Sequence, residues 1–401
     1  MFGTAALWRA LAAHTEARVA STAEQSLART TLTVEPLARS RTRHLPALDG
    51  LRAISVLLVM ISHAGLGHVV PGGLGVTVFF FISGFLITRL LLEEHDANGR
   101  ISFRRFYARR FLRLGPALVV YVLLASLAIV AVGGAFWMQD IAAALFYYAN
   151  YHQIFTGFQH AVALAPDGGA VRLQSPFSIL WSLAIEEHFY FLFPLTLASL
   201  APSLKRGMWL FVALLVVILA WRLFLAHAGA THDRIYMGTD TRIDSILFGV
   251  VAAVTGRLMR PERARRTRLI WLACVIGVAL MLVSLLARDP AFRETWRYSL
   301  QGLALTALVP ALVFAPALAA PRRMLEHDFI VYVGKLSYSL YLYQYLVVML
   351  ATWFCALNAL PQYGWTWIAI FVALTPLLAM ASYHGVEQPF LRWRRRLGSS
   401  A

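Results

Sequence analysis

Arg52 and His63 are ionisable side chains inside one apolar run, Leu51–Gly65. Charged groups in a segment that can cross a bilayer are costly to keep, and they usually face the bundle interior and mark a pathway or site. Eleven residues at about 100° each place both side chains within about 20° of one helix face, roughly 16 Å apart. A mid-membrane imidazole can stay neutral and take a proton on demand. The pair predicts proton-handling chemistry, although Arg52 alone could mark a membrane border by snorkelling.

A second segment, SFRRFYARRFLRLGP, is rich in arginine, and we expect its arginines to lie in a short loop on the inner side between two spans. Its arginines alternate with aromatic residues, a pattern that suits a polyanion carrying a flat ring, because guanidinium groups bind phosphates bidentately and stack on rings. Coenzyme A and nucleotides match this description, and anionic lipid headgroups are an equal alternative. The residues concerned are Arg104, Arg105, Arg109, Arg110 and Arg113.

Acidic residues appear in two further segments. Glu186 and Glu187 lie in WSLAIEEHFYFLFP, where a buried carboxylate could orient an imidazole or could simply join two helices by hydrogen bonds. Asp240 and Asp244, four residues apart in TDTRIDSILFG, could flank one cation or sugar, or could bracket Arg242 structurally. Both interpretations remain open for each segment.

Other polar residues and glycines complete the candidates. Asn150 and His152 lie in a moderately apolar, aromatic stretch and could face a cavity. Glu387 precedes Pro389 near the end of the last apolar run, where a structural role is favoured. The segment PGGLGVTVFFFISGFLIT contains glycines that suit close helix packing better than catalysis, namely Gly72, Gly73, Gly75 and Gly84.

Composition indicates the elements that must hold these residues. The chain has 401 residues, is 59% hydrophobic, and has a mean hydropathy of +0.64. Runs near or above about 20 apolar residues predict an all-α, polytopic membrane helical bundle of about ten transmembrane helices. The predicted spans are 48–66, 73–92, 114–133, 177–199, 208–226, 242–256, 268–287, 298–319, 329–353 and 364–386.

The distribution of basic residues predicts the orientation. Of the 36 Lys and Arg residues, 26 fall in one set of alternate loops and termini and 5 in the other set. The positive-inside rule therefore places both termini in the cytoplasm and explains the net charge of +16 without nucleic-acid binding. The same count keeps 134–176 outside as a non-spanning segment, because one more span would invert every later loop.

We expect three regions: a cytoplasmic N-terminal tail of low order over 1–44, a membrane domain over 45–393, and a basic cytoplasmic tail over 394–401. Residues 1–44 lack the long apolar core and cleavage site of a signal peptide. The two cysteines, Cys274 and Cys355, predict neither a disulfide nor a metal site.

In combination, the segments resemble the acyltransferase-3 family of integral membrane acyltransferases over about residues 45–393. We expect a stand-alone membrane domain, without the hydrolase-like domain that is fused to some members. The resemblance rests on seven segments in family order: LDGLRAISVLLVMISHAG, GGLGVTVFFFISGFLIT, RRFLRLGP, WSLAIEEHFY, DTRIDSILFG, GKLSYSLYLYQ and SYHGVEQPFL.

The resemblance implies a function and a set of roles. Family members generally move an acyl group, commonly acetyl, from cytoplasmic acyl-CoA to a hydroxyl of a glycan or another acceptor. The family's arginine–histidine motif falls on Arg52 and His63, and its membrane glutamate on Glu186 or Glu187. Thr77 and Gln344 depart from the family pattern, which has an acid and commonly a histidine there. We expect neither departure to affect the pair of Arg52 and His63.

The resulting hypothesis is an O-acetyltransferase of the bacterial inner membrane, with acyl-CoA as donor and no tightly bound cofactor or metal. In this hypothesis His63 acts as a general base or carries the acyl group, Arg52 or another donor of the bundle stabilises the oxyanion, and Glu186 could hold the His63 tautomer. We expect the arginine-rich segment to bind the donor. Five residues are expected to bind the carbohydrate acceptor: Asn150, Glu187, Asp240, Arg242 and Asp244.

Two alternatives remain open. One is an acyltransferase that acts on a small secreted metabolite or oligosaccharide. The other, less favoured, is a transporter in which buried His, Glu and Arg form a proton relay, although neither inverted repeats nor interrupted helices in matching halves support it. A non-catalytic membrane scaffold is the least favoured reading. The sequence predicts no oligomeric state.

Overall fold

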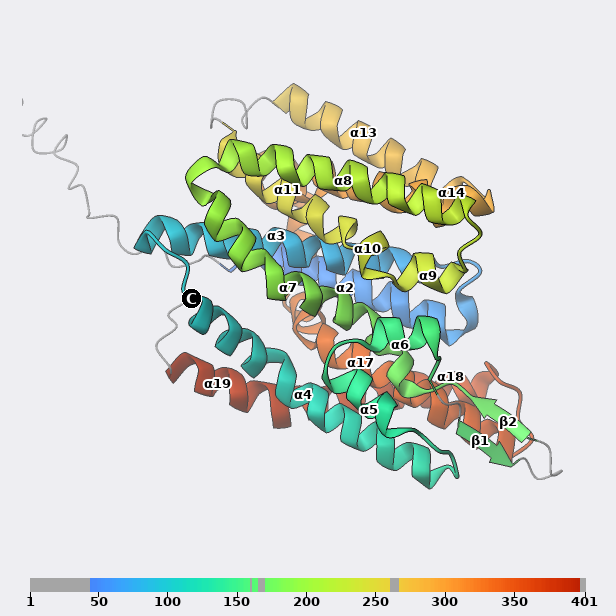
Figure 1. Ribbon diagram of the computed structural model, residues 1–401. Helices are drawn as coiled ribbons and strands as arrows, with labels where there is room; N and C mark the ends of the chain where they lie inside the picture. The colour runs from blue at the N-terminus through green and yellow to red at the C-terminus, as the bar shows by residue number, and fades with distance from the viewer. Residues whose placement is uncertain (1–43, 159–160, 165–169, 260–266, 397–401) are drawn as a thin grey trace, which may run out of the picture. The chain divides into compact units, whose positions relative to one another are not determined.

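The computed structural model describes residues 44–158, 161–164, 170–259 and 267–396. These residues form a bundle of long helices (Figure 1). Each predicted span overlaps one long helix. In chain order the long helices are α2 (Pro46–Ile61), α3 (Gly72–Asn98), α4 (Phe103–Ala131), α7 (Trp181–Leu200), α8 (Leu204–His227), α11 (Asp244–Leu258), α13 (Thr267–Leu286), α15 (Trp296–Phe314), α17 (Asp328–Leu357) and α18 (Trp365–Ser382).

Shorter elements connect or extend the long helices. Two of them, η1 and η5, are π-turns that continue α2 and α18 directly. The short elements are η1 (Ser62–Leu66), α5 (Met138–Leu145), α6 (Ala149–Phe155), β1 (Ala161–Leu164), β2 (Ala170–Leu173), η2 (Pro176–Leu180), η3 (Ala201–Ser203), α9 (His232–Met237), α10 (Thr239–Arg242), α14 (Pro290–Glu294), η4 (Pro316–Leu318), α16 (Ala319–Leu325), η5 (Tyr383–Glu387) and α19 (Gln388–Arg396).

Eight stretches of the described residues are long and apolar enough to cross a membrane. One of them, Pro176–His227, contains both α7 and α8, which are joined by η3. α11 has 15 residues and is about 22 Å long, which is shorter than a bilayer core of about 30 Å. α10 precedes α11 directly and lengthens this segment. The protein is therefore a polytopic integral membrane protein, as predicted.

The segment between α4 and α7 does not cross the bundle. It contains α5 and α6, of 8 and 7 residues, which are too short to span a bilayer. It also contains the antiparallel hairpin of β1 and β2, in which Ala161 pairs with Leu173. The predicted all-α fold is thus correct apart from two strands of four residues each.

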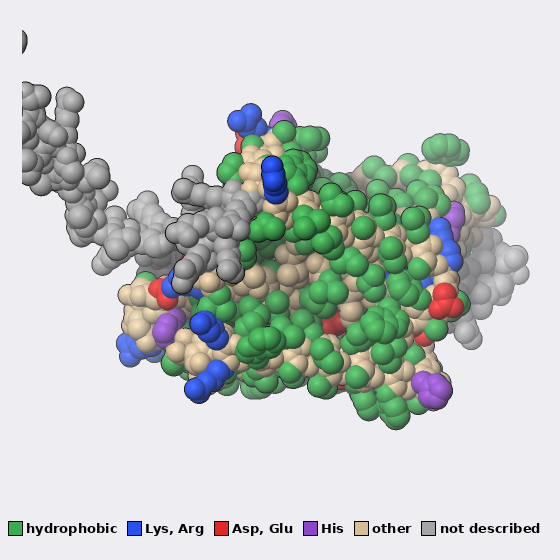
Figure 2. Space-filling view, turned by 90° about the horizontal axis from the view of Figure 1, so that it is seen from above, with side chains coloured by type: hydrophobic (Ala, Val, Ile, Leu, Met, Phe, Trp, Pro, Cys, Tyr) green, Lys and Arg blue, Asp and Glu red, His purple; other side chains and the backbone are tan. Residues whose placement is uncertain are grey.

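The surface of the bundle is apolar where lipid would contact it. Hydrophobic side chains cover much of the face seen in Figure 2. α13 has only three buried residues, Cys274, Gly277 and Ser284, although the whole helix is hydrophobic. A helix that is hydrophobic on every side and yet exposed fits a membrane environment rather than water.

The basic end is where α3 ends and α4 begins, and the hairpin end is where β1 and β2 lie (Figure 1). The predicted tail 1–44 lies outside the described residues except for His44. The predicted tail 394–401 does so beyond Arg396, the last residue of α19.

Glycines bring the central helices into direct backbone contact. A Cβ on Gly84 of α3 would collide with the carbonyl oxygen of Ile246 on α11. A Cβ on Gly249 of α11 would likewise collide with the carbonyl oxygen of Phe81 on α3. The structure therefore supports the packing interpretation of the glycines in the α3 segment, and α3 is held at a fixed position between α2 and α11.

Candidate active site

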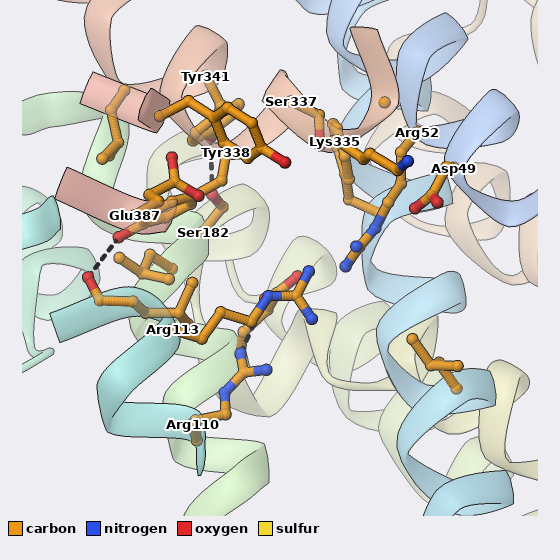
Figure 3. A pocket seen from close by; sticks show the side chains of 18 of the residues that line it. Asp49, Arg52, Arg110, Arg113, Ser182, Lys335, Ser337, Tyr338, Tyr341 and Glu387 are labelled. Carbon is orange, nitrogen blue, oxygen red and sulfur yellow. Dashed lines mark hydrogen bonds and ion pairs between the residues drawn. The ribbon is translucent and has the colours of Figure 1, made fainter. Parts of the chain in front are cut away.

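A cavity of about 300 Å³ lies between α2, α4, α7 and α17 and is called here the basic cavity. Figure 3 shows the guanidinium groups of Arg52, Arg110 and Arg113 converging on its interior. Lys335 of α17 and three carboxylates also line it. The charged lining residues are Asp49, Arg52, Arg110, Arg113, Glu186, Lys335 and Glu387.

Arg110 is bound to carboxylates on one wall of this cavity. Its Nε lies 2.9 Å from Glu187 Oε1, and its Nη2 lies 3.4 Å from Glu186 Oε2. The guanidinium also lies over the Tyr190 ring at 3.2 Å, and Ser83 donates a hydrogen bond to Glu186. Arg110 thus has two anionic partners, and the same cavity also holds the cations Arg52, Arg113 and Lys335, which can attract a ligand phosphate.

The five arginines of the predicted donor site do not act as one patch. The segment is not a loop: α4 begins at Phe103, and its arginines are good helix formers. Only Arg110 and Arg113 line the basic cavity. Arg109 forms an ion pair with Glu94 at 3.1 Å, and Arg104 and Arg105 are exposed and line neither cavity of this site.

A second cavity, of about 320 Å³, lies toward the hairpin end and is called here the neutral cavity. His63 lines it together with residues of η1, α3, α6, η2, α7, α9 and α17. Of the described side chains that line it, none is Asp, Glu, Lys or Arg. Its polar lining residues are Ser62, His63, Gln153, Gln174, Ser178, Trp181, Tyr236, Tyr341 and Tyr345.

A π-turn sets the position of His63. α2 ends at Ile61, and the chain continues through η1 with Gly65 at φ +93°, a conformation that favours glycine. The His63 ring meets Tyr345 edge-on, with centroids 5.1 Å apart. Its Nδ1 lies 3.4 Å from Gln344 Oε1. Arg52 and His63 are thus separated, because Arg52 lines the basic cavity and His63 lines the neutral cavity.

The two cavities meet at Val76 and Tyr341, which line both of them. The Tyr341 hydroxyl donates a hydrogen bond to the Ile179 carbonyl at 3.2 Å. Since its one proton is used there, the hydroxyl accepts the 2.6 Å hydrogen bond from Ser182. This small network forms the boundary between the basic and the neutral cavity.

Two sequence-based expectations are wrong. Glu186 does not contact His63, because α7 places it in the basic cavity with Arg110 and Ser83. Gln344, one of the departures from the family pattern, contacts His63 and therefore does affect the Arg52–His63 pair. The other departure, Thr77, accepts a hydrogen bond from Arg242 at 3.2 Å.

The predicted acceptor residues are distributed elsewhere. Asp240 binds Arg234 and Trp221. Asp244 is fully buried and pairs with Arg222 at 2.9 Å. The two carboxylates therefore have separate arginine partners and do not flank one ligand.

The other predicted acceptor residues are also not lining residues. Arg242 is fully buried and stacks over Tyr298 at 3.8 Å. Glu187 binds Arg110. Asn150 donates to Met237 O and Thr239 Oγ1, and neither cavity includes it in its lining.

Several site residues on α17 were missed by sequence reasoning. Lys335, Tyr338, Tyr341 and Tyr345 follow a spacing of three to four residues and line the cavities from one side. A polar stripe at helical spacing along an apolar helix is a signal that could have found them. Gln153, one turn from the predicted Asn150, also lines the neutral cavity and has a buried Oε1 without a partner among the described residues.

Comparisons with known proteins give further information. A family model described as an acyltransferase domain matches residues 45–384. The O-acetyltransferase OatA of Staphylococcus aureus strain NCTC 8325 is 31% identical over 360 residues, covering 86% of this chain and 57% of that protein. A protein of S. aureus strain N315 with a provisional O-acetyltransferase name is 31% identical over 374 residues, covering 88% of this chain.

The chain spans 59% of the length of the strain N315 relative. No solved structure matches the chain.

Proposed function

The chain belongs to the acyltransferase domain family, and from this premise we propose that it is a membrane O-acetyltransferase. In this proposal acetyl-CoA is the donor and a carbohydrate hydroxyl is the acceptor. One observation carries the proposal: a cavity rich in cations meets, at Tyr341, a cavity whose described lining has no charged residue other than His63.

The basic cavity suits the donor. Arg52, Arg113 and Lys335 line it, and guanidinium and ammonium groups are the usual partners of phosphates in proteins. Phe79, Phe80 and Tyr338 supply apolar and aromatic surface in the same space. This combination matches a molecule with phosphates at one end and a slender thioester arm at the other. An anionic lipid headgroup would bind the cations but would not fill the part of the cavity that extends to Tyr341.

The neutral cavity suits a carbohydrate. Amide and hydroxyl groups both donate and accept hydrogen bonds, as sugar hydroxyls require, and Trp181, Tyr236 and Tyr345 offer flat apolar faces. No described lining residue carries a charge that would attract an ionic acceptor. His63 is the titratable group there that can remove a proton near neutral pH.

The reaction proceeds at the boundary between the cavities. His63 takes the proton of the acceptor hydroxyl, and the hydroxyl oxygen bonds to the thioester carbonyl carbon. The carbon–sulfur bond then breaks, and the coenzyme A thiolate leaves and takes up the proton from His63. An acyl-His63 intermediate is the alternative route.

We place the basic end in the cytoplasm of a bacterium and the protein in its inner membrane. The unequal distribution of Lys and Arg supports this orientation, and the curated relatives named above are bacterial. Cytoplasmic acetyl-CoA would then reach the basic cavity directly, and the acceptor would enter from the opposite side.

A transfer assay tests the proposal. The protein in lipid nanodiscs is given radiolabelled acetyl-CoA and neutral oligosaccharides, and label released by mild alkali reports O-acetyl ester. His63→Ala should lower the rate by roughly 10²- to 10⁴-fold, the usual contribution of a general base. His68→Ala, an exposed histidine five residues away, should act like the unaltered protein.

A His63→Ala variant that retains the normal transfer rate would contradict the proposed mechanism. Acetyl-CoA hydrolysis without labelled oligosaccharide would instead reject a neutral oligosaccharide as the acceptor.

A further inference from the structure

Gln344 of α17 is fully buried next to His63, and its side-chain amide has one defined orientation. Its Nε2 donates a hydrogen bond to the Tyr341 carbonyl oxygen at 3.3 Å, in the preceding turn of the same helix. A carbonyl oxygen can only accept, so the amide nitrogen must face it. The amide oxygen Oε1 is therefore the atom that faces His63.

This orientation determines the tautomer of His63. Oε1 has no proton to give, so the 3.4 Å contact is a hydrogen bond only if His63 Nδ1 carries the proton and donates it. The other ring nitrogen, Nε2, then holds the free lone pair. Nε2 has no hydrogen-bond partner among the described residues, and the side chain lines the neutral cavity. The basic nitrogen is thus the one available to an acceptor hydroxyl.

Among the neighbours of His63, Gln344 is the one that can select its tautomer. Tyr345 of α17 meets the ring edge-on, and Tyr236 of α9 lines the same cavity. Tyr363, in the loop after α17, lies against Gly65. No Asp, Glu, Lys or Arg belongs to the described lining of the neutral cavity. Gln344 is therefore the group that can select one tautomer without adding charge.

We propose that Gln344 is a positioning residue that holds His63 as the Nδ1-protonated tautomer and so presents Nε2 to the acceptor hydroxyl. This inference rests on the proposed acetyl transfer. A neutral partner does not stabilise the imidazolium as a carboxylate would, so His63 releases its proton readily to the departing thiolate.

Two substitutions separate positioning from packing. Gln344→Leu approximately keeps the volume but removes the acceptor oxygen, and kcat should fall by about 10- to 100-fold, as activity does when the partner that orients a metal-bound histidine is removed. The KM for acetyl-CoA should not change, because the basic cavity is untouched. Gln344→Glu keeps an acceptor oxygen and should retain more activity than Gln344→Leu.

A purely structural role predicts the opposite order, because a buried leucine is better tolerated inside a membrane bundle than a buried carboxylate. The pH profile adds a second readout. A carboxylate at 344 favours protonated His63, and a general base must be neutral to act. The acidic limb of the kcat profile of Gln344→Glu should therefore move to higher pH.

The matched control is Gln362→Leu, at an exposed glutamine in the loop after α17, which should leave kcat and the pH profile unchanged. Gln344→Leu with near-normal kcat, or Gln344→Glu no more active than Gln344→Leu, would overturn the inference. Acetyl-CoA binding by each variant reports whether it is folded. Absence of acetyl transfer by the unaltered protein would instead reject the proposed function.

Discussion

At the scale of single residues, sequence reasoning selected His63 correctly as a cavity residue but assigned it the wrong partner. Gln344 lies 281 residues away along the chain, and a contact over that distance cannot be read from local spacing. Glu186 was expected to contact His63 because it is an acid in a membrane span. Its ion pair with Arg110 places it in the other cavity.

The arginine-rich segment was predicted with the wrong secondary structure. Interpreting it as a loop made its five arginines equivalent. As part of α4, they point in different directions, because successive helical residues differ by about 100°. Arg110 and Arg113, three residues apart, share the face that lines the basic cavity. If the segment is treated as a helix, Arg110 and Arg113 fall on a different face from Arg104.

This difference leads to a prediction at the residue scale. Arg113→Ala should raise the KM for acetyl-CoA by about 10- to 100-fold, since a hydrogen bond to a charged group contributes about 1.5–3 kcal/mol. The kcat should change little, because binding to the phosphates is equal in the ground and transition states. Initial rates over a range of acetyl-CoA concentrations measure both constants.

Arg104→Ala is the matched control, because Arg104 is an exposed arginine of the same helix and lines neither cavity. Its kinetics should equal those of the unaltered protein. Equal KM increases in the two variants would mean that the segment acts as a general basic patch, as an anionic lipid surface would require.

At the scale of elements, hydropathy predicted the helices well and their irregularities poorly. Each of the ten predicted spans overlaps a long helix, because a run of apolar residues is a strong and local signal. The π-turn η1 was not predicted, although it sets the position of His63. Gly65 at positive φ and its contact with Tyr363 depend on a loop that is remote in sequence.

The close contact of α3 and α11 gives a prediction at this scale. Gly84→Ala should destabilise the protein by about 1–3 kcal/mol, because the added methyl collides with the backbone of Ile246 and the helices must separate. Thermal unfolding in detergent, followed by far-UV circular dichroism, measures the change as a lower Tm.

Gly256→Ala tests the alternative that any glycine substitution in these helices is harmful. Gly256 lies on α11, and an added Cβ there meets nothing within 4 Å. Alanine is a better helix former than glycine by about 1 kcal/mol, so this variant should be as stable as the unaltered protein or more stable. A lower Tm for Gly256→Ala than for Gly84→Ala would contradict the packing argument.

At the scale of the whole molecule, the bundle holds two chemically different cavities that meet inside it. The basic cavity contains residues of the basic end, such as Asp49, Arg113 and Lys335. The neutral cavity contains residues of η1, α6 and α9 toward the hairpin end. Neither cavity could be predicted from sequence, because each is assembled from helices that are far apart along the chain.

From this arrangement we propose that the donor reaches the boundary at Tyr341 from the basic end and that the acceptor reaches it from the hairpin end. Transfer measured in sealed vesicles tests it directly. The orientation of the protein is established by labelling a cysteine introduced at the exposed Arg104 with a membrane-impermeant reagent. Native Cys274 and Cys355 are both buried, so they should not interfere.

The measurement is the rate at which acetyl ester forms when acetyl-CoA is supplied on one side only and the oligosaccharide on the other. We predict transfer when acetyl-CoA is on the side of the Arg104 label, and no transfer above background when the two substrates are exchanged. Equal rates in both arrangements, or transfer only with acetyl-CoA on the hairpin side, would contradict the account.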